Sequence, residues 1–370
     1  MRSPEIGPKR FNGKSIIKRP LTLGNPLKLP RVLLVSPIDA SFVREDTRLL
    51  EEFCDVAPFQ FRDWRDYPRL AREVSRCDLV FCWFATEFAG VVAVLARILG
   101  RGLVLVSGGW DISRMPEIGY GSLLRMRGRV AARISLRLAD RVLSFSDWSA
   151  DAIRRLVPRS NVHRVYLGVD TDRFRPSRKE NLVVSVAHVS RENLARKGLV
   201  TFVKAASLVP DAHFCLIGHN WDDAVEHLAA LTSQNVEFTG WLPDEELRAM
   251  LARAKVYVQA SFSEGFGLAL AEAMSAECVP VVTRVGAIPE VVGDTGFYFP
   301  YGDECALAEA IRAALHSTKG SLARERIQLQ FTIENRLREL RDAVYGAWRV
   351  PQVDSRRSLG SHAAVERGPR

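Results

Sequence analysis

Two glutamates flank a glycine-rich loop in the second half of the chain. The loop follows the apolar run Val256 to Gln259, which predicts a strand, and precedes a helix-forming segment. Within it, Gly265 and Gly267 let the backbone approach a ligand closely. A helix starting after them would direct free amides and the positive end of its dipole at an anion. With Glu264 and Glu272 on either side, this pattern indicates a site for a diphosphate.

Carboxylates on both sides of such a loop suit a sugar nucleotide. Carboxylate oxygens accept hydrogen bonds from hydroxyls, and a sugar nucleotide carries hydroxyls on both sides of its diphosphate. Glu264 would lie in the loop beside the ligand, and Glu272, about one turn into the helix, could reach the same cleft. Each glutamate alone leaves an alternative open, because Glu264 could be a solvated loop residue and Glu272 could pair with a nearby arginine.

Three cations follow the predicted strand Leu182 to Ala187. Cations placed after a strand can clamp phosphates, and the candidates are Arg191, Arg196 and Lys197. The alternative is an exposed charged loop or the start of a helix.

Asp111 is the candidate in the first half of the chain. It closes the run Ser107-Gly108-Gly109-Trp110-Asp111 at the end of a predicted strand, where ligands gather in open α/β sheets. An aspartate there could orient or deprotonate an acceptor hydroxyl. A structural role, capping the following segment Ile112 to Arg114, remains equally open.

These residues need parallel sheets to position them. Short β-branched and apolar runs alternate with helix-like segments, which is the pattern of βαβ units and indicates an α/β protein. Strands are predicted at 31–36, 79–84, 103–107, 141–144 and 162–166, and then at 182–187, 212–218, 236–239, 256–259, 279–283 and 296–299. Helices are predicted at 306–316 and 333–348.

A turn-rich polar stretch, Gly168 to Pro176, separates the two sets of strands and predicts a domain boundary. Residues 31–167 would form a first domain, and residues 168–350 a second domain with a terminal helix. Residues 1–30 are expected to be a basic, flexible segment without the apolar core of a secretory signal, and residues 351–370 a polar tail.

The stretch that carries the glutamates resembles glycosyltransferase family 4. Glu264 and Glu272 stand in an E-x7-E arrangement around Gly265, Phe266 and Gly267. The likeness continues through Ala273, Met274, Pro280, Val281, Val282, Gly286, Pro289, Glu290, Val291, Val292, Gly302 and Asp303. One departure is Glu277, which follows Ser275 and Ala276 where the family usually has a glycine.

The resemblance implies the GT-B fold, in which two Rossmann-like βαβ domains face each other across a cleft. Residues 31–167 would bind the acceptor and residues 168–350 the nucleotide sugar. It also implies that Glu264 contacts the donor sugar, Glu272 the ribose, and the amides near Gly267 and Leu268 the phosphates. The predicted catalytic residues are Glu264, Lys197 and Asp111, and the predicted donor-binding residues are Arg191, Arg196, Lys197, Gly265, Phe266, Gly267, Leu268 and Glu272.

In that family an arginine and a lysine of the first loop bind the donor diphosphate. Lys197, directly before Gly198, matches the lysine, while Arg191 and Arg196 both remain candidates for the arginine.

The function that follows is a retaining transfer of a sugar from a nucleotide-diphosphate donor to a hydroxyl of a carbohydrate or lipid-linked acceptor, in polysaccharide or glycoconjugate assembly. Two alternatives stay open, because a fold does not fix a reaction. One is a catalytically silent GT-B relative that acts as a binding protein. The other is a different GT-B enzyme, such as a nucleotide-sugar epimerase.

Metal and cofactor chemistry is not predicted. The 7 histidines and 6 cysteines stand in none of the spacings typical of metal sites, and the cysteines are expected to be buried reduced thiols. The donor's phosphate charge would be balanced by Lys197 and helix-end amides, so no cofactor beyond the donor is expected.

The formal charge of +9 points to an acidic partner. Five arginines recur every four residues, with an apolar series, Leu123, Met126, Val130, Ile134 and Leu138, on a different face of the same predicted helix. This helix could lie on an anionic membrane or pack its apolar side inward. The five are Arg125, Arg129, Arg133, Arg137 and Arg141.

Neither nucleic-acid binding nor a membrane-spanning segment is predicted. No zinc spacing or aromatic RNA-binding signature accompanies the arginines, and no apolar run approaches the length of a spanning helix. A cytoplasmic protein is the expectation, and it would lie at the inner face of the membrane if the basic helix binds lipid.

Overall fold

The computed structural model describes residues 29–348, so the predicted tail and all but the last two residues of the predicted N-terminal segment lie outside the described part. The first domain holds a six-stranded sheet in the order β2-β1-β3-β4-β5-β6, parallel throughout. Its strands are β1 (Arg31–Ser36), β2 (Asp55–Gln60), β3 (Leu79–Trp83), β4 (Gly102–Ser107), β5 (Arg141–Ser144) and β6 (Val162–Arg164). Its helices are α1 (Ser41–Glu51), α2 (Tyr67–Arg76), α3 (Glu87–Ile98), α4 (Met126–Leu138) and α5 (Asp147–Leu156).

The second domain repeats this architecture with the strand order β12-β11-β10-β7-β8-β9, again parallel. Its strands are β7 (Glu180–Val186), β8 (His213–Ile217), β9 (Val236–Gly240), β10 (Ala254–Gln259), β11 (Val279–Thr283) and β12 (Phe297–Phe299). Its helices are α6 (Arg191–Arg196), α7 (Leu199–Ser207), α8 (Ala224–Ala229), α9 (Asp244–Arg253), α10 (Leu268–Ser275), α11 (Ile288–Val292) and α12 (Glu304–Leu315). The prediction of two βαβ domains is confirmed.

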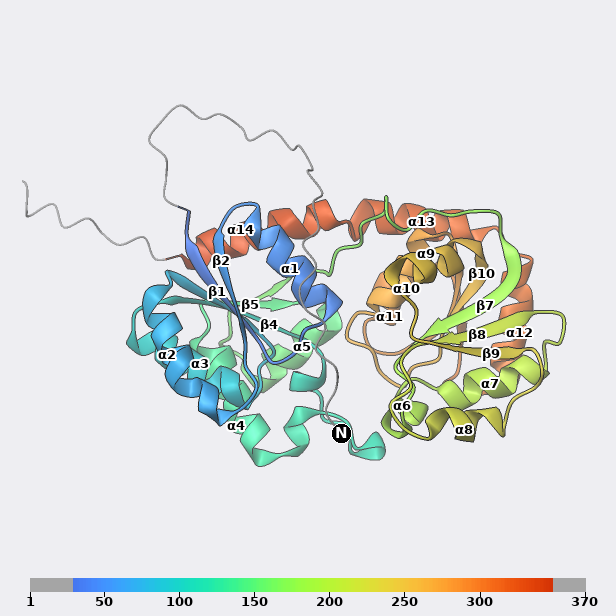
Figure 1. Ribbon diagram of the computed structural model, residues 1–370, viewed down its shortest axis with the longest axis horizontal. Coiled ribbons are helices and arrows are strands. Elements are labelled where there is room, and N and C mark those ends of the chain that lie inside the picture. Colours follow the sequence, from blue (N-terminus) through green and yellow to red (C-terminus); the bar gives the residue numbers. More distant parts are fainter. Residues whose placement is uncertain (1–28, 349–370) are drawn as a thin grey trace, which may run out of the picture.

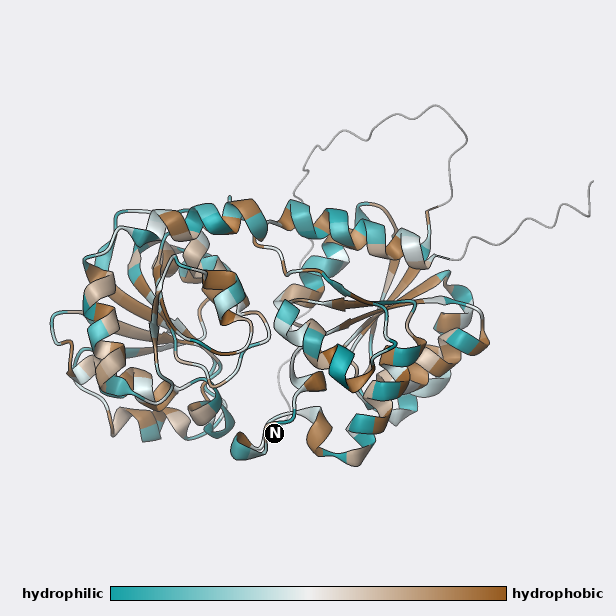
Figure 2. Cartoon of the chain, turned by 180° about the vertical axis from the view of Figure 1, so that it is seen from behind, coloured by the Kyte–Doolittle hydropathy of each residue, from teal (hydrophilic) through white to brown (hydrophobic). Residues whose placement is uncertain are grey.

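Helices cover both faces of each sheet, and this explains the composition of the strands. Every residue of β3, β4 and β11 is buried, as expected for central strands of a doubly covered parallel sheet. These central strands are accordingly hydrophobic along their length, while many hydrophilic residues lie on the helices (Figure 2).

Among the elements that were not predicted from the sequence, β2 and α13 show why. β2 is an edge strand, largely exposed and interrupted by Pro58, so it lacks the apolar run that marks the central strands. The helix α13 (Lys319–Gln330) buries only Gly320, Ala323 and Ile327, and its apolar residues do not form a helical stripe.

The terminal helix α14 (Ile333–Ala347) returns to the first domain, although the sequence assigned it to the second. It packs against α1, β4 and β5, and its Tyr345 ring lies 6.0 Å from the ring of Phe53. α13 and α14 therefore run along one edge of both domains (Figure 1).

The chain crosses between the domains twice at one place. Val169 N–H donates to the Phe331 carbonyl at 2.8 Å, and Ile333 N–H donates to the Val169 carbonyl at 3.2 Å. Beside these bonds, the buried Arg336 guanidinium of α14 binds both carboxylate oxygens of the buried Asp46 of α1, at 2.6 and 2.7 Å. This cluster joins the last helix to the first.

The basic helix differs from its prediction. Arg125 precedes α4, and Arg141 opens β5, where its Nη1 lies 2.6 Å from His163 Nε2. α4 buries its small residues together with Leu136, whereas Met126, Val130 and Ile134 of the apolar series are exposed, so inward packing does not hold for these three residues. The buried set is Gly128, Ala131, Ala132, Ser135 and Leu136.

None of the helices in residues 29–348 is long and apolar enough to cross a membrane.

Arg336→Met should lower the melting temperature by several degrees, because it leaves Asp46 buried without its partner, a loss of about 3–5 kcal/mol. Thermal unfolding measures the effect. The exposed Arg338→Met on the same helix is the control and should change little. Adding Asp46→Leu to Arg336→Met should restore much of the loss. A melting temperature for Arg336→Met equal to that of the wild type would contradict this role.

Candidate active site

The glycine loop after β10 lines an interdomain cavity of about 240 Å³. Gly267, with a φ of +91°, lets the chain turn directly into α10 and has no side chain to cap the helix. The first amides of α10 are therefore left for a ligand, at the positive end of the helix dipole. The predicted residues that line this cavity together are Arg196, Glu264, Gly265, Phe266, Gly267 and Leu268.

Glu264 is held by a close ion pair with Lys197, whose Nζ lies 2.5 Å from Glu264 Oε2. Gln259 Nε2 donates to the same oxygen at 3.0 Å. Burial raises the pKa of Glu264, but the charges of Lys197 and Arg196 and the hydrogen bonds outweigh it, so the pKa lies below its ordinary value. Glu264 is therefore ionised at neutral pH and acts as a hydrogen-bond acceptor.

The structure separates the two candidate arginines. The predicted loop contains the short helix α6, capped by Ser190, which puts Arg191 and Arg196 at opposite ends. Arg191 is exposed and forms a two-pronged pair with Asp223, at 2.8 and 2.9 Å, so it does not join the cleft cluster. Arg196 lines the cavity, and its guanidinium carbon lies 5.0 Å from the ring centre of Tyr120 of the first domain.

Glu272 lies in a second cavity, of about 330 Å³, which adjoins the first and shares Leu268 with it. Burial, with a further contribution from the charge of Asp244, raises the pKa of Glu272 to about 8, although Arg173 acts in the opposite sense. This carboxyl is therefore largely protonated at neutral pH and could donate as well as accept a hydrogen bond.

Aromatic rings form the wall that the first domain contributes, and sequence reasoning missed them. Phe84 has a φ of +71°, which is uncommon for a bulky residue and turns the end of β3 at the cleft. The run Phe81-Cys82-Trp83-Phe84 at the end of a predicted strand was the available signal. The aromatic lining residues are Phe42, Trp83, Phe84, Trp110, Tyr120, Phe145 and Trp148.

Asp111 has no exposed surface, and its carboxylate is bound by its own loop and by Ala85, which follows β3. Oδ2 accepts from Ser107 Oγ at 2.6 Å and from Ala85 N–H at 2.9 Å, and Oδ1 accepts from Gly109 N–H at 3.0 Å. This geometry favours a structural role in shaping the loop. The catalytic role stays a prediction, and in this arrangement the carboxylate does not line the cavity.

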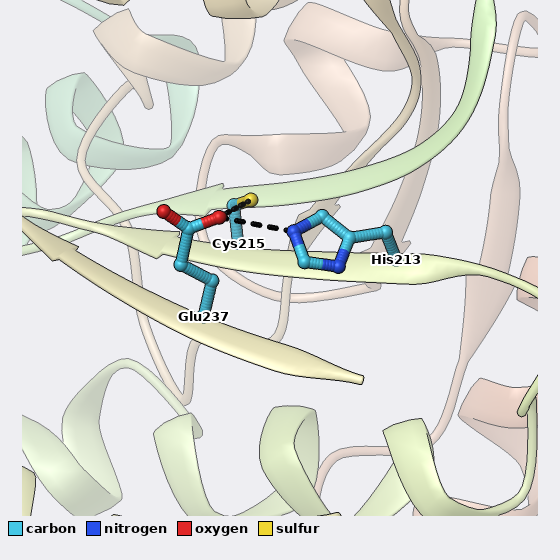
Figure 3. Close-up of side chains that lie close together, drawn as sticks. All are labelled: His213, Cys215 and Glu237. Atoms are coloured by element: carbon cyan, nitrogen blue, oxygen red, sulfur yellow. Dashed lines mark hydrogen bonds and ion pairs between the residues drawn. The ribbon is translucent and has the colours of Figure 1, made fainter. Parts of the chain in front are cut away.

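Outside the cleft, the described residues contain one group of three side chains that could ligate a metal ion (Figure 3). His213 Nε2 lies 3.0 Å from Glu237 Oε2, and the Cys215 thiol donates to that oxygen at 3.6 Å. Burial raises the pKa of the Cys215 thiol to about 12, so it keeps its proton at neutral pH. The three groups satisfy one another by hydrogen bonds, and we assign no ion to them.

The fold matches solved structures of low sequence identity. HepE of Anabaena, in complex with UDP and glucose, superposes with a TM-score of 0.71 at 20% identity, over 85% of this chain and 99% of that chain. Sucrose-phosphate synthase of Thermosynechococcus elongatus gives a TM-score of 0.69 at 17% identity, over 85% and 98%. The protein therefore has the GT-B fold.

Two family models match, and together they cover most of the described chain. "Glycosyltransferase Family 4" matches residues 31–173, and "Glycosyl transferases group 1" matches residues 180–317. The chain belongs to glycosyltransferase family 4.

Relatives with assigned activities match over part of their length. Sulfoquinovosyl transferase SQD2 of Arabidopsis thaliana is 30% identical over 50% of this chain and 41% of its own. The MMP alpha-(1->4)-mannosyltransferase of Mycolicibacterium hassiacum is 34% identical over 48% of this chain and 43% of its own. The putative colanic acid biosynthesis glycosyltransferase WcaL of Escherichia coli is 27% identical over 72% and 70%. For the first two, the aligned region spans less than half of the relative's length.

Glu272→Gln should gain stability relative to the wild type as the pH rises. The folded-state pKa lies above the ordinary 4.5, so the stability that comes from a neutral Glu272 is present in acid and is lost as the pH rises through about 8. Glutamine is neutral throughout. The variant should therefore gain on the order of 2 kcal/mol between about pH 5 and pH 9. Thermal melts at both pH values measure this, with the exposed Glu309→Gln as control. Parallel pH profiles for wild type and Glu272→Gln would refute it.

Proposed function

We propose that this protein is a retaining glycosyltransferase that moves a sugar from a nucleotide-diphosphate donor to a hydroxyl of a carbohydrate or lipid-linked acceptor, in polysaccharide or glycoconjugate assembly. The observation that carries the proposal is the cluster at the cleft. An ionised Glu264 paired with Lys197 stands beside Arg196 and the uncapped start of α10.

The donor is a nucleotide sugar in this proposal. Arg196, Lys197 and the α10 amides would bind its diphosphate, Glu264 its sugar and Glu272 its ribose. The similarity to HepE supports this assignment, because that protein was solved with UDP and with UDP-glucose. No metal or other cofactor is part of the proposal, since the two cations and the helix dipole can balance the phosphate charge.

For the reaction, we favour departure of the diphosphate on the same face that the acceptor hydroxyl attacks. Lys197, Arg196 and the loop amides would stabilise the negative charge that develops on the leaving phosphate. The ion pair lowers the basicity of Glu264, which suits a residue that positions the sugar better than one that attacks it. The two alternative functions are disfavoured, because the family to which the chain belongs and the relatives that match it are transferases.

A panel of UDP, GDP, ADP and their sugar conjugates should reveal one nucleotide that raises the melting temperature. A ligand present at about 100 times its Kd stabilises by about 2.7 kcal/mol. Glu272→Ala should weaken the shift through the lost ribose contact, while Glu309→Ala, an exposed residue of α12, should not. If millimolar nucleotide leaves the wild type unchanged, the donor assignment fails. With the donor known, the product's anomeric proton signal in an NMR spectrum tests retention.

We also propose where the protein acts: on the cytoplasmic side, at the inner face of an anionic membrane. Val91 and Val94 of α3 and Met126, Val130 and Ile134 of α4 are exposed and line one apolar groove. Exposed apolar residues beside several cations suit contact with anionic lipid. The exposed arginines of α4 are Arg127, Arg133 and Arg137.

Val130→Glu should weaken pelleting with vesicles of phosphatidylglycerol and phosphatidylcholine roughly tenfold, because it removes apolar contact and adds repulsion. Leu329→Glu on α13 is the matched control, since Leu329 is also an exposed apolar helix residue but lies in the second domain's terminal region, away from the groove. Wild-type protein that fails to pellet with anionic vesicles, or equal pelleting of both variants, would exclude this surface.

A further inference from the structure

Glu290 of α11 reaches across the cleft to the first domain. Its Oε2 accepts from Asp147 N–H and its Oε1 accepts from Trp148 N–H, each at 2.7 Å. These are the first two amides of α5, so a carboxylate of one domain closes the helix N-terminus of the other. The Tyr166 hydroxyl lies 3.4 Å from Oε2 and donates to it.

The first turn of α5 is fully paired only with this contact in place. Ser146, the N-cap residue, accepts from Ser149 N–H at 3.1 Å through its own side chain. Asp147 and Trp148 N–H point outward from the helix end and have no partner within their own helix. A negative charge at this position also interacts favourably with the helix dipole. Glu290 thus supplies, from the second domain, the hydrogen-bond acceptors for the first two amides of α5.

The same segment of the second domain is bonded to the glycine loop. Ala287 N–H donates to the Glu264 carbonyl at 2.9 Å, and Glu290 N–H donates to the Ala287 carbonyl at 3.0 Å. Gly286, with a φ of +54°, packs so closely on the Glu264 backbone that a side chain would collide with it. The position of Glu290 is therefore coupled to that of Glu264.

The glycine loop also touches the first domain beside α5. A Cβ added at Gly265 would lie 2.7 Å from the Gly108 carbonyl oxygen and 2.8 Å from the Phe145 ring. Phe145 stands two residues before the start of α5. One connected segment of the second domain therefore makes both contacts with the first domain, through Glu290 at α5 and through Gly265 at Phe145.

We propose that Glu290 is a positioning residue, a latch that holds the closed arrangement in which the glycine loop meets Gly108 and Phe145. It acts through the α5 amides and the Glu264 loop and touches no reacting atom. Its importance for transfer rests on the proposed function. The latch itself is a property of the protein without ligand.

Hydrogen exchange of the α5 amides, followed by NMR or mass spectrometry, tests the latch directly, and small-angle scattering reports domain opening. Glu290→Ala should speed exchange of the Asp147 and Trp148 amides at least tenfold and increase the radius of gyration. Glu290→Gln keeps one acceptor oxygen, so its exchange rates and radius of gyration should lie between those of the wild type and Glu290→Ala. Exchange in the central strands β3 and β11 should not change, which separates loss of a latch from general destabilisation.

Two matched variants of Asp147, in the first domain, test the same contact at the helix end that Glu290 binds. Asp147→Pro and Asp147→Ala both lose the Asp147–Arg164 ion pair, but only proline also removes the amide that Glu290 binds. Proline suits the first position of a helix, and Ser146 before it is extended, with a ψ of 159°. Asp147→Pro should have a larger radius of gyration than Asp147→Ala and faster exchange of the Trp148 amide.

Unchanged exchange and an unchanged radius of gyration in Glu290→Ala would overturn the latch, as would equal behaviour of the two Asp147 variants. These measurements need no nucleotide. A wild type that binds none of UDP, GDP or ADP would defeat the proposed function and leave the latch standing. Nucleotide binding together with unaltered exchange in Glu290→Ala would do the reverse.

Discussion

The buried pair of Asp46 and Arg336 is the interaction on which the arrangement of the two domains depends. Arg336 also donates to the carbonyls of Val165 and Tyr166, where the chain leaves the first domain. One guanidinium therefore holds the first helix, the last helix and the linker at a single point. A buried ion pair adds little net stability over a well-packed apolar pair, so its value lies in fixing geometry. Both crossings of the chain are therefore fixed at this point.

The cleft beside this point has two unlike walls. The second domain contributes charge and amides, through Lys197, Glu264 and the start of α10, while the first domain contributes mainly aromatic rings. Apolar walls lower the local dielectric, which strengthens the interaction of a bound anion with the opposite cations. The division suits a donor bound on the second domain and an acceptor whose apolar or ring faces pack against the first. The small residues Gly108 and Gly265 allow the walls to touch without blocking the cavity.

The parts of this site that are local in sequence could be predicted, and those that depend on distant partners could not. Strand, glycine loop, helix and both glutamates follow from one continuous stretch around Glu264, and the central strands follow from their apolar runs. The choice between Arg191 and Arg196 depended on Asp223 and Tyr120, which are remote in sequence. The departure at Glu277 proves to be conformational, because this residue adopts the φ of +63° that a glycine would accept without strain. Its neighbour Gly320 packs against its carbonyl, so the backbone path is kept although the side chain differs.

The basic helix α4 shows why periodicity alone cannot say which face of a helix is inward. Its apolar series and its arginines were both visible in the sequence, which left open whether the apolar series packs inward or faces a membrane. The neighbouring helix decides which face is inward, since a Cβ on Gly90 of α3 would lie 3.3 Å from the Ala131 backbone, so only small residues fit between the two helices. Close packing of Gly90 against Ala131 puts this face of α4 inward and leaves Met126 and Val130 exposed, beside the arginines. The exposed face of α4 therefore carries both apolar side chains and arginines. These apolar side chains are exposed because the opposite face of the helix is tightly packed against α3.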